Sequence, residues 1–275
     1  MPILRGDRLR GTNSGLAKKR IATQLCTLAI CNAGFTAALK TGLVVPFLYC
    51  HGCPLASFAC PMGALQHFLG RHEAPFLVLG LLSLAFLVLG RWGCGWLCPF
   101  GALQDLLAYL AGRKPKKPKG WSGAEVALRQ AKLGVLLGSL AASYLLAGTT
   151  FCWLCPVGAI FAGIPYVLLQ ERPVVGLFFY VHMLVLMAVL LAAMYVPRAW
   201  CRYLCPIGAL AGLFNDISSL HLELDEELCV RCHACLEACP MGIADLRDLG
   251  GRDCILCGRC VSACPRGALK IALRP

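Results

Sequence analysis

The sequence predicts an all-α membrane domain of four transmembrane helices with an internal two-fold repeat, followed by a small α+β domain. Three observations lead to this fold class. Of the 275 residues 58% are hydrophobic and only 15% are charged, with a mean hydropathy of +0.69, a balance typical of membrane proteins. One Cys-Pro phrase recurs beside the long apolar runs. From Leu222 onward the charge rises and the apolar runs stop.

Four apolar runs are each close to the ~20 residues that a transmembrane helix needs. They are residues 21–39, 74–90, 127–147 and 174–196. The first run follows a basic tail, residues 1–20, and taken alone it could be a signal peptide. Because three further runs follow, we interpret it as an uncleaved first span. The predicted domains are therefore the tail 1–20, a membrane domain 21–221 and a C-terminal domain 222–275.

The basic residues predict the orientation. The chain has 26 Lys and Arg against 14 Asp and Glu, a formal charge of +12. They are concentrated in the tail and in RKPKKPK at 113–119, whereas 51–73 and 149–173 have almost none. The positive-inside rule then places both termini in the cytoplasm, with the chain in the inner membrane of a prokaryote. We interpret the charge surplus as a topology signal, and the alternative for RKPKKPK is a patch that binds anionic lipid or nucleic acid. Membrane lipid is an expected partner, and nucleic acid is not.

The recurring phrase is Cys-Pro-x-Gly-Ala. It reads CPMGAL at Cys60, CPFGAL at Cys98, CPVGAI at Cys155 and CPIGAL at Cys205, and a fifth copy stands at Cys264. Proline suits the first position of a helix, where free amides and the helix dipole favour negative charge. Each membrane phrase therefore predicts a short or re-entrant helix that begins at a thiolate.

The C-terminal domain carries C-x2-C-x2-C-x3-C-P twice, from Cys229 and from Cys254. This is the spacing of bacterial two-cluster ferredoxins, in which the fourth cysteine of each run binds the other cluster; a four-thiolate zinc site is the competing interpretation. The first predicted [4Fe–4S] cluster takes Cys229, Cys232, Cys235 and Cys264. The second takes Cys254, Cys257, Cys260 and Cys239.

Nine further cysteines belong to the membrane phrases, in two groups. The cytoplasmic group, a predicted third cluster, is Cys94, Cys98, Cys201 and Cys205. The outer group, a predicted fourth cluster, is Cys50, Cys53, Cys60, Cys152 and Cys155, of which one is surplus. Cys60 and Cys155 fit the repeat best, whereas Cys50 and Cys152 have the least support as ligands. Simple packing between helices is the alternative, and it is our interpretation of Cys26 and Cys31.

Other chemistry has little support in the sequence. Four polar residues after the phrases, Gln66, His67, Gln104 and Asp105, could hydrogen-bond a quinone headgroup or could simply be polar helix ends. His182 lies in the fourth span without a facing histidine in another span, so haem is not expected. No dinucleotide loop, P-loop or HExxH helix is present, and we assign no catalytic residue.

Four spans, repeated Cys-Pro phrases and a terminal two-cluster domain resemble the NapH/MauN-type membrane ferredoxins. The resemblance runs from Ile21 to Cys264, although CHGCPLASFACP departs from the plain CxxxCP form. It implies electron transfer at the cytoplasmic membrane, often from quinol to partner redox proteins, and some relatives assist cofactor maturation.

We therefore expect an electron-transfer subunit of a larger oxidoreductase complex of the quinol dehydrogenase type. Its four clusters would carry electrons between a quinone pool, or an outer-side partner, and a cytoplasmic redox partner. The alternatives are an electron-donating maturation factor for a partner enzyme's cofactor and a membrane anchor or scaffold subunit.

Overall fold

A computed structural model describes residues 14–34, 39–112, 123–169 and 176–274. Most of the predicted tail and the RKPKKPK loop lie outside these ranges. The first half of the region predicted to be a membrane domain, called the membrane domain below, consists of α1 (Ser14–Cys31), α2 (Pro61–Gly70), α3 (Phe76–Leu89), α4 (Trp92–Trp96) and α5 (Pro99–Leu110). The second half consists of α6 (Gly123–Leu146), the 3-10 turn η2 (Thr150–Leu154), α7 (Pro156–Gly158), the π-helical turn η3 (Ala159–Gly163), α8 (Ile164–Leu169), α9 (Leu177–Tyr195), α10 (Ala199–Tyr203) and α11 (Pro206–Phe214).

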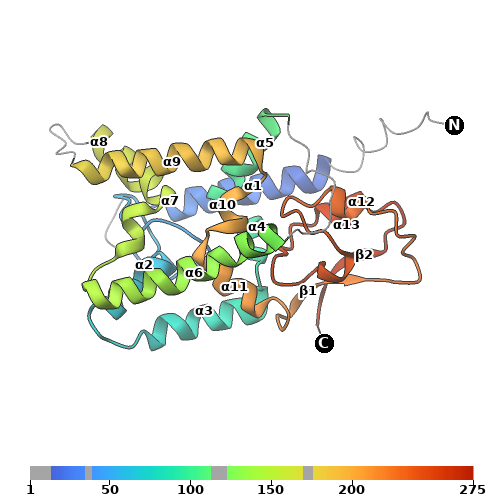
Figure 1. The fold of residues 1–275 in the computed structure, drawn as a ribbon, viewed down its shortest axis with the longest axis horizontal. Coiled ribbons are helices and arrows are strands. Elements are labelled where there is room, and N and C mark those ends of the chain that lie inside the picture. The colour runs from blue at the N-terminus through green and yellow to red at the C-terminus, as the bar shows by residue number, and fades with distance from the viewer. Residues whose placement is uncertain (1–13, 35–38, 113–122, 170–175, 275) are drawn as a thin grey trace.

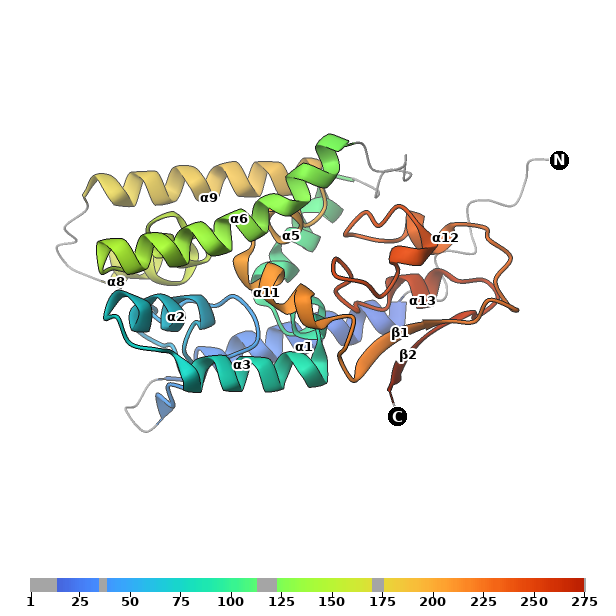
Figure 2. The same ribbon diagram turned by 60° about the horizontal axis from the view of Figure 1, so that its bottom comes forward.

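The two halves repeat one order of elements. A long helix, a short helix that begins with Cys-Pro, a second long helix and two short helices follow one another in each half. The long helices α1, α3, α6 and α9 run lengthwise through the molecule (Figures 1 and 2). Helices α2 and α8 lie toward one end of it, and the C-terminal domain covers the other end, where α1 begins.

The C-terminal domain is small and mixed in structure. Its strands β1 (Leu220–Leu224) and β2 (Leu269–Leu273) pair antiparallel, with Leu222 opposite Ile271. Between them lie α12 (Ala234–Glu237), the 3-10 turn η4 (Leu246–Asp248) and α13 (Arg259–Ala263). The strand pair closes the domain, because it joins the residues before the first cysteine run to those after the second. β1 begins two residues before the predicted boundary at 222.

The lengths of the four long helices differ from the predicted spans. Among the described residues, α9 is the one helix that is both long enough and apolar enough to cross a membrane. Helix α3 has 14 residues, or about 21 Å at 1.5 Å per residue, which is shorter than the ~30 Å hydrocarbon core. Helix α6 starts at Gly123 and includes Arg129 and Lys132 within its first three turns.

The first predicted span, 21–39, is displaced in the structure. Helix α1 runs from Ser14 to Cys31, so it includes Lys18, Lys19 and Arg20. Arg20 is buried and forms an ion pair with Asp105 at 2.9 Å, which compensates its charge inside the fold. After Cys31 the chain turns, and a Cβ added at Gly34 would lie 2.8 Å from the carbonyl oxygens of Leu55 and Ala56. Within the described residues, the apolar run therefore leaves its helix after Cys31 and continues into a closely packed turn at 32–34.

Two clusters of buried residues form the core. The larger one fills the membrane domain, around Phe47, Met62, Phe86, Phe100 and Ile207. The smaller one belongs mainly to the C-terminal domain, yet it also contains Cys94 and Cys201 of the membrane domain. The two domains therefore share one packed core at the place where the inner cysteines lie.

Candidate functional site

Each of the four membrane phrases begins a helix with its cysteine. Cys60, Cys98, Cys155 and Cys205 stand directly before α2, α5, α7 and α11, each with extended backbone angles and with proline as the first helical residue. The Cys60 Sγ accepts a hydrogen bond from the Gly63 N–H at 3.5 Å, and the Cys205 Sγ accepts one from Gly208 at 3.3 Å. At these two helix starts a free amide therefore reaches sulfur, as the phrase predicts, whereas Cys98 and Cys155 accept no such cap bond. The fifth copy differs, because Cys264 ends α13 and Pro265 lies in a turn.

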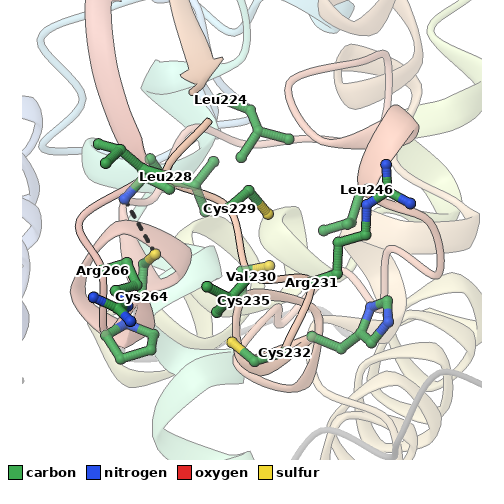
Figure 3. Close-up of a pocket in the computed structure, with 14 residues that line it drawn as sticks. Leu224, Leu228, Cys229, Val230, Arg231, Cys232, Cys235, Leu246, Cys264 and Arg266 are labelled. Atoms are coloured by element: carbon green, nitrogen blue, oxygen red, sulfur yellow. Dashed lines mark hydrogen bonds between the residues drawn. The ribbon is translucent and has the colours of Figure 1, made fainter. Parts of the chain in front are cut away.

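The C-terminal domain contains two cavities that divide its eight cysteines. Cys229, Cys232, Cys235 and Cys264 line the first, and their sulfurs gather around one space in Figure 3. Cys239, Cys254, Cys257 and Cys260 line the second. The fourth cysteine of each run therefore lies in the cavity of the other run, which is the arrangement that crossed ligation requires.

The two cysteine runs share an unusual backbone conformation. Arg231 and His233 flank Cys232 with φ of 49° and 57°, and Leu256 and Gly258 flank Cys257 with φ of 48° and 74°. Left-handed residues other than glycine are strained and tend to cluster at functional sites. Backbone N–H groups also reach sulfur, from Leu256 to Cys254 at 3.5 Å and from Ala268 to Cys264 at 3.3 Å. Such bonds suit thiolates better than thiols, because a charged acceptor strengthens them.

The inner group brings together four buried cysteines from both halves of the repeat. Cys94, Cys98, Cys201 and Cys205 are each less than 10% exposed. Burial, and then the charges that Cys201, Cys94 and Cys98 would carry, raise the pKa of the Cys205 thiol well above its ordinary value. Four thiols this close repel one another when ionised, so a positively charged metal centre would be needed to hold them all as thiolates.

Two buried arginines surround the inner group, and the sequence reasoning did not single them out. Arg91 and Arg198 are fully buried. Each stands three residues before a cysteine, in RWGC and RAWC, and this shared position is the signal that could have found them. Arg198 also binds Asp105 at 2.8 Å, and Arg91 donates to the Arg252 carbonyl at 2.7 Å. The arginines connect the inner group to both halves and to the C-terminal domain.

The outer group separates into four thiols and a fifth. Burial raises the pKa of the Cys60 thiol to about 12, and the charges that Cys152 and Cys50 would carry act in the same direction. Cys155 is influenced in turn by Cys60 and Cys50, so these four lie in one region. The Cys53 Sγ instead donates to Asn32 Oδ1 at 3.4 Å, at the end of α1. Cys53 is still close enough to Cys50 for its charge to raise the pKa of the Cys50 thiol. The bond to Asn32 is therefore the feature that distinguishes Cys53 from the other four thiols.

The four polar residues predicted near a quinone do not form one site. Gln66 and Gln104 are fully buried, whereas His67 is exposed. Asp105 forms ion pairs with Arg20, Arg198 and Arg259. The burial of Gln66 and Gln104 and the ion pairs of Asp105 do not favour contact with a quinone headgroup, and a quinone near these four residues stays a prediction.

Sites for a single metal ion are not seen among the described residues. Across the part of the chain that the structure describes, no three His, Cys, Asp or Glu side chains are placed to hold one metal ion. Thiolates on one zinc ion lie about 2.3 Å from it and hence close to one another. The cysteines here surround a space instead, and none of them is in a disulfide. This donor set fits an inorganic cluster whose separate corners each take one thiolate.

The fold and these sites define an iron–sulfur protein of the ferredoxin type, and comparison with known proteins agrees. A family described as "4Fe-4S binding domain" matches residues 57–74, 72–118, 132–170 and 178–224, so that each stretch contains one Cys-Pro phrase. A second family of the same description matches residues 222–244 and 252–270. No solved structure matches the chain.

Three curated relatives illustrate the similarity. An uncharacterized protein of Methanocaldococcus jannaschii is 31% identical over 69% of this chain and 76% of its own length. The putative electron transport protein YccM of Escherichia coli is 30% identical over 62% of this chain and 47% of its own length. The methylamine utilization ferredoxin-type protein MauN of Methylorubrum extorquens is 30% identical over 65% and 59%. The chain thus spans about half of the length of the last two relatives.

Ferredoxin-type proteins named NapH, from Haemophilus influenzae and Escherichia coli, match a similar share of the chain. The chain belongs to the NapH/MauN-type ferredoxin family, and the predicted resemblance is confirmed. It is a ferredoxin-type electron transport protein with 4Fe-4S binding domains.

Proposed function

We propose that this protein is an integral-membrane electron conduit with four [4Fe–4S] clusters, and that it works as a subunit of a larger redox complex. It would carry electrons between a quinone pool or an outer-side partner and a cytoplasmic redox partner. The observation that carries this proposal is the shared core, in which Cys94 and Cys201 of the inner group pack with Cys239, Cys254 and Cys257. The inner site and the second ferredoxin site are thus direct neighbours.

The proposed ligands follow the four groups of thiols. The first cluster would be held by Cys229, Cys232, Cys235 and Cys264, the second by Cys239, Cys254, Cys257 and Cys260, and the third by Cys94, Cys98, Cys201 and Cys205. Four of the five outer cysteines would hold the fourth. Iron–sulfur clusters take up and release single electrons. The chain supplies the thiolates, the amides that stabilise them and a buried environment.

Membrane integration is supported by the apolar side chains that α3 and α9 leave exposed. Phe76 and Leu77 of α3 are 79% and 73% exposed, and Leu177 and Leu184 of α9 are 77% and 70% exposed. A water-facing surface would not carry such rows of large apolar groups, whereas hydrocarbon accommodates them. We propose that residues 21–221 form the membrane domain, that α1, α3, α6 and α9 cross the bilayer, and that residues 222–275 lie in the cytoplasm of a prokaryotic cell.

The order of the proposed sites supports a route for the electrons. The outer and inner groups would divide a hydrocarbon crossing of ~30 Å into shorter steps. The inner group is next to the second ferredoxin site, where the Trp96 Nε1–H donates to the Leu256 carbonyl at 3.1 Å. In the first ferredoxin site Cys232 is exposed, and it lies between exposed Arg231 and His233. This exposed edge is the place where a cytoplasmic partner would exchange electrons.

Iron content and reduction by quinol test the proposal. Four clusters with four irons each give 4 × 4, or about 16 irons per purified full-length chain, with an equal amount of acid-labile sulfide. Replacing Cys98 and Cys205 with Ser should remove about four irons and stop electron transfer from a quinol or an outer-side donor to the ferredoxin clusters. About eight irons in the wild type, zinc in place of iron, or unchanged transfer after these replacements would contradict the conduit.

A further inference from the structure

Two glutamines occupy the same position in the two phrases of the first half. Gln66 is six residues after Cys60, and Gln104 is six residues after Cys98. The corresponding positions of the second half hold Phe161 and Ala211, so each proposed membrane site has one glutamine. Both side chains are fully buried. A buried carboxamide needs partners for its oxygen and for its two N–H groups, so its contacts indicate its task.

The carboxamide oxygens make equivalent bonds to the second half of the chain. Gln66 Oε1 accepts the Phe151 N–H at 2.9 Å, and Gln104 Oε1 accepts the Trp200 N–H at 3.1 Å. In both cases the next residue along the chain is a cysteine, Cys152 or Cys201. Each glutamine thus fixes the backbone of the segment that carries one thiol of its site.

The carboxamide N–H groups of the two glutamines differ in their hydrogen-bond partners. Gln104 Nε2 donates to the Cys201 Sγ at 3.3 Å and to the Phe100 carbonyl oxygen of its own helix at 3.5 Å. Gln66 Nε2 is buried, and no hydrogen-bond partner is found for it among the described residues. An unpaired buried donor costs about 1–3 kcal/mol, so an acceptor is expected beside it. The equivalence of the two glutamines indicates that this acceptor is the sulfur of Cys152.

On the basis of the proposed function, we propose that Gln66 and Gln104 are positioning residues that each donate an N–H to a cluster-bound thiolate, at Cys152 in the outer site and at Cys201 in the inner site. The outer ligands are then Cys50, Cys60, Cys152 and Cys155. Cys53 is the surplus thiol, which agrees with its bond to Asn32 Oδ1. Hydrogen bonds to the sulfurs raise the reduction potential of a cluster, because they stabilise the more negative reduced state.

Variants of the full-length protein, purified in detergent, test the glutamines. Gln104→Glu and Gln66→Glu keep an oxygen that can bind the backbone N–H and remove the N–H donor, but they add charge. Gln104→Met and Gln66→Met remove the donor without adding charge, and they also remove the oxygen that accepts the backbone N–H. Midpoint potentials are measured by redox titration with electron paramagnetic resonance. Each variant should lower the potential of its own site by about 59 mV, a tenfold change in the one-electron equilibrium. Gln130→Glu, an exposed glutamine on α6, is the matched control and should change nothing.

Iron analysis tests the ligand set. Cys152→Ser should lose about four irons per chain, whereas Cys53→Ser should keep the wild-type iron content. Full iron with unchanged potentials in the Gln→Met variants would overturn the role of the glutamines, even if the Gln→Glu variants respond to their charge. Iron loss in Cys53→Ser with retention in Cys152→Ser would overturn the ligand set. A wild-type chain with only about eight irons would instead refute the proposed function, so the two failures are distinguishable.

Discussion

Arg198 donates a hydrogen bond from Nη1 to the carbonyl oxygen of Cys94 at 2.9 Å, although the two residues belong to different halves of the repeat. The reverse contact is also present, because Arg91 Nη2 lies 3.4 Å from the carbonyl oxygen of Cys201. The two halves therefore exchange equivalent arginine contacts across the inner site. Both guanidinium groups are buried, and each has a carboxylate nearby, Asp105 for Arg198 and Asp253 for Arg91.

Arg198→Met should destabilise the protein strongly. The replacement removes the closest cation from buried Asp105 and leaves the Cys94 carbonyl without its donor, and breaking a buried ion pair costs about 3–5 kcal/mol. Thermal unfolding of the purified protein, followed by circular dichroism, measures the effect. Arg71→Met is the matched control, because Arg71 is 63% exposed at the other end of the molecule. Equal unfolding temperatures for the two variants would show that the arginine contacts across the inner site do not hold the two halves together.

The same arginine contacts explain why the inner Cys-Pro-x-Gly phrases have a glycine, since a larger residue would contact the guanidinium groups. A Cβ added at Gly101 would lie 3.2 Å from the Arg198 guanidinium, and one added at Gly208 would lie 2.9 Å from that of Arg91. Gly101→Ala and Gly208→Ala should therefore displace the arginines and lower the unfolding temperature.

The controls for this prediction lie in α6. At Gly134 and Gly138 an added Cβ would meet nothing within 4 Å. Alanine at these positions should be neutral or stabilising, by up to about 1 kcal/mol, because it restricts the unfolded chain and favours the helix. A loss of stability in α6 equal to that at Gly101 would remove the steric explanation.

Contact between the membrane and ferredoxin domains depends on Gly95 in α4. A Cβ there would clash with the Ile255 carbonyl oxygen, and the Gly95 carbonyl itself accepts a bond from Gln24 at 3.1 Å. Gly95→Ala should push the second ferredoxin site away from the inner site and slow electron transfer between them, as rapid-mixing spectroscopy would measure. Gly93→Ala, in the same helix with ordinary contacts to Pro46 at 3.5 Å, should transfer at the wild-type rate.

Features written in local sequence were predicted better than features that depend on distant partners. The Cys-Pro phrases predict helix starts because proline fixes the backbone within one residue of the cysteine. The extent of α1 could not be predicted from hydropathy, since Arg20 is stabilised inside the fold by Asp105, 85 residues away. Gln66 and Gln104 looked like helix-end polar groups for the same reason, because their bonds reach Phe151 and Trp200.

Asp105 should stabilise the protein equally at pH 5 and pH 8. Burial alone would raise the pKa of this carboxyl, but Arg198, Arg259 and Arg20 outweigh burial and lower the pKa to about 2. A lowered folded-state pKa gives stability above the unfolded-state value, which is lost only as the pH falls toward 2. Asp105→Asn should therefore cost about 3–5 kcal/mol at both pH values. An effect that appears only at pH 8 would show that Asp105 titrates in the ordinary range.

The orientation in the membrane can be tested at the two ends of the long helices. The turn at Arg71–Glu73 between α2 and α3 lies at the end opposite the C-terminal domain (Figures 1 and 2). If residues 222–275 are cytoplasmic, alkaline phosphatase inserted at His72 should be active, because this enzyme needs an oxidising compartment for its disulfides. The same enzyme fused after Leu273 should be inactive, whereas a fluorescent protein fused there should fold and fluoresce. Activity of both phosphatase fusions, or of the C-terminal one alone, would reverse the proposed route, since the exposed edge at Cys232 would then face an outer-side partner.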